Sequence, residues 1–313
     1  MTATESNHIA CSNCLSHNHT RYTKTSDMEY FTGSKEFDFY LCNDCDVIFI
    51  HPQPLDELET IYPKNYYSFN DEPKGLSFRI KYRLDGIFLE RILKRLPQKE
   101  LHVLDVGGGT GITCDIIKKA DSRVIETQIV DIDRQARQTA EQKGHRFFCG
   151  LIEHFEHSGK YDVILLLNLI EHVADPQAVL LKAKQLLAPG GIIIIQTPNH
   201  RSLDARLFRH TYWGGLHCPR HWIIFSKASF LSLANKCGLQ VQRFSYTQGA
   251  AFWAVSVLHL LRKKNWIKAG ATAPLVYHPA FGFISMLAAG FDFARKPFAP
   301  LSQMQVILKH PEK

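Results

Sequence analysis

Four of the eight cysteines have the spacing of metal ligands. Cys11 and Cys14 form one Cys-x-x-Cys pair, Cys42 and Cys45 form another, and 27 residues separate the pairs. Thiolates from two such turns can surround one zinc ion as a tetrahedron. No coordination position would then remain open for water, so the sequence predicts a structural zinc ion. Its binding would supply the folding free energy of a small N-terminal ribbon.

A glycine-rich run is the second feature with chemical meaning. Asp105 is followed by Gly107, Gly108, Gly109 and Gly111. Glycines let a backbone turn tightly and approach a ligand, and the start of a following helix offers unpaired N–H groups. Position 112 is Ile, so the dinucleotide pattern G-x-G-x-x-G is absent, and so is the Gly-Lys-Ser/Thr of a P-loop. A plain strand–helix turn remains the alternative.

An acidic residue follows the next apolar run at a suitable distance. Asp131 lies about where a carboxylate accepts hydrogen bonds from ribose hydroxyls in nucleotide-binding sheets. Asp133 is close by, but its position before a helical segment favours an N-cap.

Histidines supply the candidates for moving a proton, because the imidazole pKa lies near neutrality. His172 follows Glu171 just beyond an apolar run, where open α/β sheets bind ligands. His217 and His221 lie in a later segment between a predicted strand and a predicted helix. A structural role remains open for each.

The elements that must position these residues follow an alternating strand–helix pattern, which predicts an α/β fold with a mostly parallel sheet covered on both faces. The predicted strands are 101–106, 126–132, 161–168, 191–197 and 239–246. The predicted helices are approximately 110–120, 133–143, 176–188 and 226–237. Asp175-Pro176 is a typical helix start, and Pro189-Gly190-Gly191 is expected to end that helix.

The chain divides into four predicted regions: a zinc ribbon (1–50), a linker and helical lid (51–98), the central α/β domain (99–247) and C-terminal helices with a final strand (248–313). The net charge of +7 is modest and its basic residues are scattered, which argues against a nucleic-acid partner. The N-terminus lacks an apolar signal segment, and no apolar run is long enough to span a bilayer, so a cytoplasmic location is expected.

Motifs in series give this region a family likeness. Residues from about 100 to 247 resemble the class I methyltransferases, which use S-adenosylmethionine (SAM) and have a Rossmann-like fold. The motifs that carry the resemblance are, in chain order, LDVGGGTG, VDID, YDVILLLNLIEHVADP and LLAPGGIIIIQTPN. The resemblance implies that Asp105 and the Gly107–Gly111 loop hold the methionine part of SAM, Asp131 the ribose, and that Asn168 lies beside the methionine end. Relatives carry a Gly-Asp pair after the third strand, whose acidic residue reads adenine; here Gly150 is followed by Leu151, which leaves backbone groups near Leu151 and Ile152.

A second likeness concerns the acceptor side. The cysteine pairs and HPQPLDELETIYPKNYY resemble the N-terminal part of zinc-ribbon sugar C-methyltransferases, which implies that Tyr62, Tyr66 and Tyr67 reach the substrate; simple packing remains the alternative. HCPRHWIIFS resembles the H-E-H-x-x-Y-F-S stretch of those enzymes. It implies a catalytic His221 and a substrate-binding His217, with Arg220 replacing the acidic neighbour.

The C-terminal region contains two apolar stretches, 250–261 and 280–291, each followed by basic residues. They are expected to cap the active site, form a homodimer interface or dock on a membrane surface. The leading hypothesis is SAM-dependent methylation of an O or C atom on a small metabolite, sugar or lipid-linked glycan precursor, with His221 and His172 as catalytic candidates. A nucleic-acid or protein methyltransferase and a non-catalytic SAM-binding protein are the alternatives.

Overall fold

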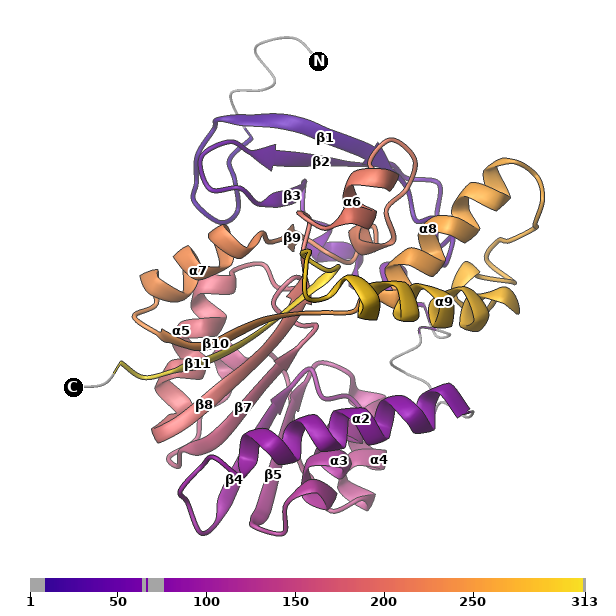
Figure 1. Cartoon of the computed structure of the whole chain (residues 1–313). Helices are drawn as coiled ribbons and strands as arrows, with labels where there is room; N and C mark the ends of the chain where they lie inside the picture. Colours follow the sequence, from indigo (N-terminus) through magenta and orange to yellow (C-terminus); the bar gives the residue numbers. More distant parts are fainter. Residues whose placement is uncertain (1–8, 64–65, 67–75, 312–313) are drawn as a thin grey trace.

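The computed structural model describes residues 9–63, 66 and 76–311, and shows two sheets with helices around them (Figure 1). The larger sheet has the strand order β10-β11-β8-β7-β4-β5-β6. Its strands are β4 (Leu101–Val106), β5 (Val124–Asp131), β6 (Arg146–Cys149), β7 (Tyr161–Leu167), β8 (Leu187–Pro198), β10 (Gln240–Thr247) and β11 (Gln303–Lys309). Strands β6, β5, β4, β7 and β8 are parallel, and β11 is antiparallel to both β8 and β10. The predicted Rossmann-like fold with a mostly parallel sheet is confirmed.

Helices cover both faces of this sheet. The α-helices are α1 (Leu58–Ile61), α2 (Leu76–Leu93), α3 (Ile112–Ala120), α4 (Arg134–Gln142), α5 (Pro176–Leu186), α6 (Leu203–Phe208), α7 (Lys227–Lys236), α8 (Ala250–Lys263) and α9 (Ala280–Arg295). Helices α2 and α3 pack on one face, and α5 and α7 contribute to the core on the other. Burial on both sides explains why the run Ile192–Ile195 has no polar alternation.

Helix α2 lies where a lid was expected. Its Leu89, Ile92 and Leu93 are buried in one cluster with Ile116 and Ile117 of α3, so this helix covers a sheet face. The expectation of a lid is therefore wrong for the helix itself, because its apolar side is already used by the core.

The helix-start signals hold, and one helix-end signal does not. Asp133 caps α4 by accepting a hydrogen bond from the Gln135 N–H, and Asp175 caps α5 through the Ala178 N–H. Helix α5 ends at Leu186, so Pro189-Gly190-Gly191 lies inside β8 instead of ending the helix. A Cβ at Gly191 would come within 2.9 Å of the Asp162 carbonyl, so close strand packing accounts for glycine there.

The smaller sheet joins the N-terminal region to the rest of the molecule. It contains β1 (His19–Thr25), β2 (Phe37–Cys42), β3 (Ile48–His51) and β9 (Ile223–Ile224). Strand β9 comes from the segment after β8 and pairs antiparallel with β3, Ile48 opposite Ile224. The N-terminal strands are thus completed by a segment that carries His217 and His221.

The C-terminal helices α8 and α9 pack against each other beside α6 (Figure 1). Helix α8 buries Ala254, Val255 and Leu258, whereas α9 exposes a row of apolar side chains: Phe283, Met286, Leu287, Phe291 and Phe293. Among the described residues, no helix has both the length and the apolar character needed to cross a bilayer.

Candidate active site

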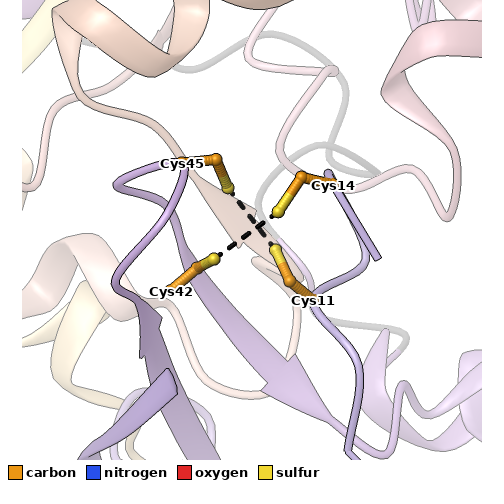
Figure 2. A group of neighbouring side chains, drawn as sticks. All are labelled: Cys11, Cys14, Cys42 and Cys45. Atoms are coloured by element: carbon orange, nitrogen blue, oxygen red, sulfur yellow. Dashed lines mark hydrogen bonds between the residues drawn. The ribbon is translucent and has the colours of Figure 1, made fainter. Parts of the chain in front are cut away.

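The four predicted zinc ligands lie together at the end of the N-terminal sheet (Figure 2). The Sγ atoms of Cys11 and Cys45 are 3.6 Å apart, and so are those of Cys14 and Cys42. All four sulfur atoms lie within 4.8 Å of one another. Zinc–sulfur bonds of about 2.3 Å in a tetrahedron require sulfur–sulfur separations of about 3.8 Å. The thiols fit a structural zinc ion.

The glycine loop between β4 and α3 has the backbone that only glycine adopts readily. Gly107 and Gly111 have φ values of +75° and +83°. A Cβ at Gly108 would meet the Asp105 carboxylate at 2.7 Å, and one at Gly111 would meet the His145 ring at 2.5 Å. The loop therefore lies tightly over Asp105 and exposes its backbone at the start of α3.

Two carboxylates support this loop. Asp131 Oδ2 accepts a hydrogen bond from the Gly109 N–H at 2.8 Å, and Oδ1 accepts one from the Asp133 N–H at 2.8 Å. Asp105 is buried, and burial together with the charge of Asp131 raises its pKa to about 7. Burial also raises the pKa of Asp131. A ligand donating hydroxyl or ammonium protons would favour the ionised form of both groups.

Two further residues of the predicted cofactor site follow β6 and β7. Asn168 has a positive φ of 53°, and its Oδ1 accepts a hydrogen bond from Gln303 of β11. Ile152 begins a short 3₁₀ helix, Ile152–His154, and its side chain is buried in the core. Only its backbone can therefore face a ligand, as its place after Cys149-Gly150 suggested.

Three histidines meet beyond the carboxyl ends of β7 and β8. The ring centroids of His172 and His221 are 4.6 Å apart, and those of His217 and His221 are 5.0 Å apart. His217 and His221 are buried, and His172 is partly exposed. Burial, with His217 nearby, lowers the pKa of His172 to about 3, and burial lowers that of His221 well below its usual value. Both rings are neutral at physiological pH.

Backbone carbonyls fix the tautomers of two of these rings. His221 Nδ1 lies 2.8 Å from the Gly215 carbonyl oxygen, and His172 Nδ1 lies 3.0 Å from that of Arg220. A carbonyl oxygen only accepts, so each Nδ1 carries the hydrogen and each Nε2 keeps its lone pair. The Tyr62 hydroxyl lies 3.0 Å from the same His172 Nδ1.

The third histidine belongs to a hydrogen-bonded chain. His217 Nδ1 lies 2.8 Å from a carboxylate oxygen of Glu29, and Nε2 lies 3.1 Å from the Tyr66 hydroxyl. The carboxylate accepts from Nδ1–H, which leaves Nε2 as the acceptor facing Tyr66. Glu29 also accepts from the Tyr212 hydroxyl at 3.0 Å. This chain orients an imidazole lone pair in a buried setting, as a general base requires.

An ion pair lies directly behind these rings. Arg220 donates to Asp27 at 2.7 Å, and both side chains are at most 2% exposed. Burial alone would raise the pKa of Asp27, but the charge and hydrogen bond of Arg220 outweigh it and the pKa is lowered. The Arg220 guanidinium also lies over the Tyr30 ring at 4.6 Å. Arg220 is thus neutralised by the N-terminal region.

The structure therefore brings together His172, His217, His221 and Tyr66, which were singled out from the sequence. Tyr67, the other predicted substrate contact, lies outside the described residues. Sequence reasoning missed Asp27 and Glu29, since they lie in a loop after β1 with no spacing motif. It also gave no role to Glu171, which is fully buried beside His221 and whose pKa burial raises to about 8.

Comparison with known proteins agrees with this geometry. A family model described as a methyltransferase domain matches residues 80–243. The chain is similar to two ubiquinone biosynthesis O-methyltransferases. The one from Rickettsia prowazekii is 29% identical over 167 residues, which are 51% of this chain and 64% of that protein. The one from Bradyrhizobium sp. strain ORS 278 is 28% identical over 102 residues, which are 32% of this chain and 40% of that protein. The chain spans less than two thirds of the length of either relative.

Two solved structures share the fold. Coclaurine N-methyltransferase, bound to N-methylheliamine and SAH, matches with a TM-score of 0.51 at 15% identity over 82% of this chain and 80% of that one. The cyclase SpnF matches with a TM-score of 0.51 at 16% identity over 78% and 86%. Because one of the two is described as a cyclase, the fold alone does not specify the reaction.

Proposed function

The chain belongs to the methyltransferase domain family, and from that premise we propose that it transfers a methyl group from SAM to an oxygen atom of a small metabolite. The observation that carries the proposal is the chain of hydrogen bonds from Glu29 through His217 to Tyr66. It presents a polarised acceptor for a hydroxyl proton beyond the sheet edge on which the glycine loop lies. O-methyltransferases among the relatives support oxygen as the acceptor atom.

The SAM site is proposed at the glycine loop. The methionine part is assigned to Asp105 and the loop glycines, the ribose to Asp131, and the adenine to backbone groups near Ile152. Asn168 is placed beside the methionine end. Bound there, SAM supplies an electrophilic methyl group on a sulfonium, and the protein must align the acceptor with it and exclude water. The residues assigned to the loop are Gly107, Gly109 and Gly111.

The acceptor side is proposed to hold and deprotonate a hydroxyl. Tyr66 and His217 contact the acceptor, and the His217 Nε2 lone pair takes the proton through the Tyr66 hydroxyl, to which it is hydrogen-bonded, while Glu29 stabilises the imidazolium that results. His172 and His221 line the same space. Tyr67 stays a predicted substrate contact without a described position.

We assign the four cysteines to one structural zinc ion, which would hold Cys11 and Cys14 against Cys42 and Cys45. We assign the ion the role of holding the N-terminal sheet in position. Strand β3, six residues from Cys42, pairs with β9, two residues from His221. Through this pairing the ion positions the histidine segment.

The electrostatics disfavour a nucleic-acid substrate. The buried acceptor cluster contains three carboxyl groups, of Asp27, Glu29 and Glu171, against one guanidinium, of Arg220. A phosphate backbone is attracted by the opposite balance. The exposed apolar face of α9, followed by Arg295 and Lys296, instead favours peripheral contact with a lipid surface and an apolar acceptor.

Methyl transfer from labelled SAM into cell extract, separated into lipid, aqueous small-molecule, nucleic-acid and protein fractions, tests the proposal. We expect label in the lipid fraction and a loss of about 100-fold in His217→Gln, the lower end of what a general base contributes. His200→Gln is the matched control, because His200 is another buried histidine whose Nε2 contacts the Asp46 carbonyl outside the cluster. Label in nucleic acid or protein, or full activity of His217→Gln, would overturn the proposal.

A further inference from the structure

We propose that Glu171, His172 and His221 form a binding site for a divalent transition-metal ion at the acceptor side. The inference rests on the proposed function, because the acceptor oxygen is the further ligand that gives the ion its chemical role. The site is separate from the four cysteines in both residues and ligand type.

The three side chains converge from two segments. Glu171 and His172 follow β7, and His221 precedes β9. One carboxylate oxygen and one nitrogen from each ring lie within 4.8 Å of one another. His221 Nε2 is 3.9 Å from Glu171 Oε1. Atoms bound to one ion lie about 3 to 3.5 Å apart, so a pair at the full 4.8 Å must close by roughly 1.3 to 1.8 Å, which the side chains supply by turning inward.

Glu171 carries the independent observation that points to a ligand. Its side chain is fully buried, and Oε2 accepts a hydrogen bond from the Thr197 hydroxyl at 3.0 Å. Oε1 has no hydrogen-bond partner in the part of the chain that the structure describes. His221 Nε2 lies 3.9 Å from Oε1, beyond hydrogen-bond distance, and carries no hydrogen to donate. A buried carboxyl oxygen without a hydrogen-bond partner is costly, and coordination to a cation would remove that cost.

The two histidines are oriented as metal ligands are. Ligating imidazoles commonly donate their second ring N–H to a backbone carbonyl, which fixes the tautomer and leaves the other nitrogen for the ion. His221 donates to Gly215 and His172 to Arg220 in this way. A pair of neutral histidines with one carboxylate is a ligand set that binds first-row divalent metals and leaves coordination positions open.

The surrounding charge favours a cation. The Arg220 guanidinium faces His172 and His221 but is neutralised by Asp27 at 2.7 Å. Glu29 lies behind His217 and adds negative charge to this side of the cluster.

A bound ion would activate the acceptor hydroxyl in a way that a single general base does not. As a Lewis acid it would lower the pKa of a coordinated hydroxyl, and the O–H proton would pass through the Tyr66 hydroxyl to His217 Nε2. The oxygen lone pair then forms a bond to the methyl carbon while the carbon–sulfur bond of SAM breaks, leaving an ether and a neutral thioether. The acceptor class is therefore a hydroxyl compound able to bind a metal, such as a phenol with a neighbouring oxygen.

Binding of Mn²⁺ to the zinc-loaded protein, followed by electron paramagnetic resonance, tests the site. Mn²⁺ prefers oxygen and nitrogen donors, so the thiolates do not compete. We expect one Mn²⁺ per chain, with hyperfine coupling to histidine nitrogen, and at least roughly tenfold weaker binding in Glu171→Gln and in His221→Gln. His200→Gln should bind as the unaltered protein does.

The result separates this site from the proposed function. No bound Mn²⁺ at millimolar concentration, no nitrogen coupling, or undiminished binding in both Glu171→Gln and His221→Gln overturns the metal site, whatever the methyl transfer. Specific Mn²⁺ binding that these substitutions weaken supports the site even where the labelled-SAM assay fails. Stimulation of methyl transfer by Mn²⁺ in the unaltered protein but not in Glu171→Gln would support both.

Discussion

The two halves of the candidate active site are built in opposite ways. The proposed SAM half is built mainly on one contiguous piece of chain, β4–loop–α3–β5, in which Asp105 and Asp131 support the glycine loop, and it adds Ile152 and Asn168 from the segments after β6 and β7. The acceptor half gathers charged, histidine and tyrosine side chains from the loop after β1, the residues around α1, the end of β7 and the segment before β9. A site built from one local stretch of backbone should keep its ligand affinity when a distant segment is disrupted. A site built from charge pairs between distant segments should lose its function when any one of those segments moves.

Removing one of the four proposed zinc ligands should have the largest effect and tests whether the acceptor half can be disrupted without the SAM half. Cys42→Ser should lose the zinc ion, which contributes roughly 10 kcal/mol or more in small zinc modules. Because β3 pairs with β9, we expect amides of both strands to lose protection from hydrogen exchange and methyl transfer to fail. SAM affinity should change little, since the hydrogen bonds from Gly107 to Val130 and from Gly109 to Asp131 tie the glycine loop to the large sheet.

A matched control for that experiment is Cys237→Ser. Cys237 is a single buried cysteine at the end of α7, far in sequence from the zinc ligands. A loss of SAM affinity in Cys42→Ser that matches its loss of methyl transfer, with both properties retained in Cys237→Ser, would show that the two halves are not mechanically separate.

A smaller effect is expected from the ion pair behind the histidines. Asp27→Asn leaves the Arg220 guanidinium buried without a counter-charge, and breaking such a pair costs about 3–5 kcal/mol of unfolding free energy. Asp38→Asn removes the partner of the half-exposed Arg21 and should cost about 0–1 kcal/mol. Urea denaturation of both variants measures the difference. Equal losses would mean that the acceptor half is no more dependent on its charges than the surface.

The same difference between local and long-range contacts explains which parts of the fold and of the candidate site could be predicted from the sequence. The strands of the large sheet were predictable because burial on two faces produces runs such as Ile192–Ile195, and caps such as Asp133 and Asp175 mark helix starts. The Cys-x-x-Cys pairs and the glycine loop were also predictable, because each is a short motif of fixed spacing. In each case the physical requirement falls on residues that are neighbours in sequence.

The acceptor half offered no such signal. Glu29 and His217 are 188 residues apart, and Asp27 and Arg220 are 193 apart. Their pairing depends on β9 joining the N-terminal sheet, and a two-residue strand has no recognisable period. The helix after Tyr66 was misjudged for a related reason: α2 is amphipathic, but the sequence does not say which surface its apolar side covers.

The subtlest expected effect lies in the SAM half itself. Asp131→Ala removes a carboxylate that supports Gly109 and is assigned to the ribose, and losing charge-assisted hydrogen bonds to two hydroxyls corresponds to roughly 100-fold weaker SAM binding. Calorimetry with SAM measures it. Asp133→Ala is the control, because loss of the α4 cap costs about 1 kcal/mol of stability and leaves the ligand untouched. Unchanged SAM affinity in Asp131→Ala would mean that local backbone alone holds the cofactor, which would sharpen the contrast with the acceptor half. Equal weakening in both variants would mean that the loop responds to the stability of its surroundings, and the contrast would fail.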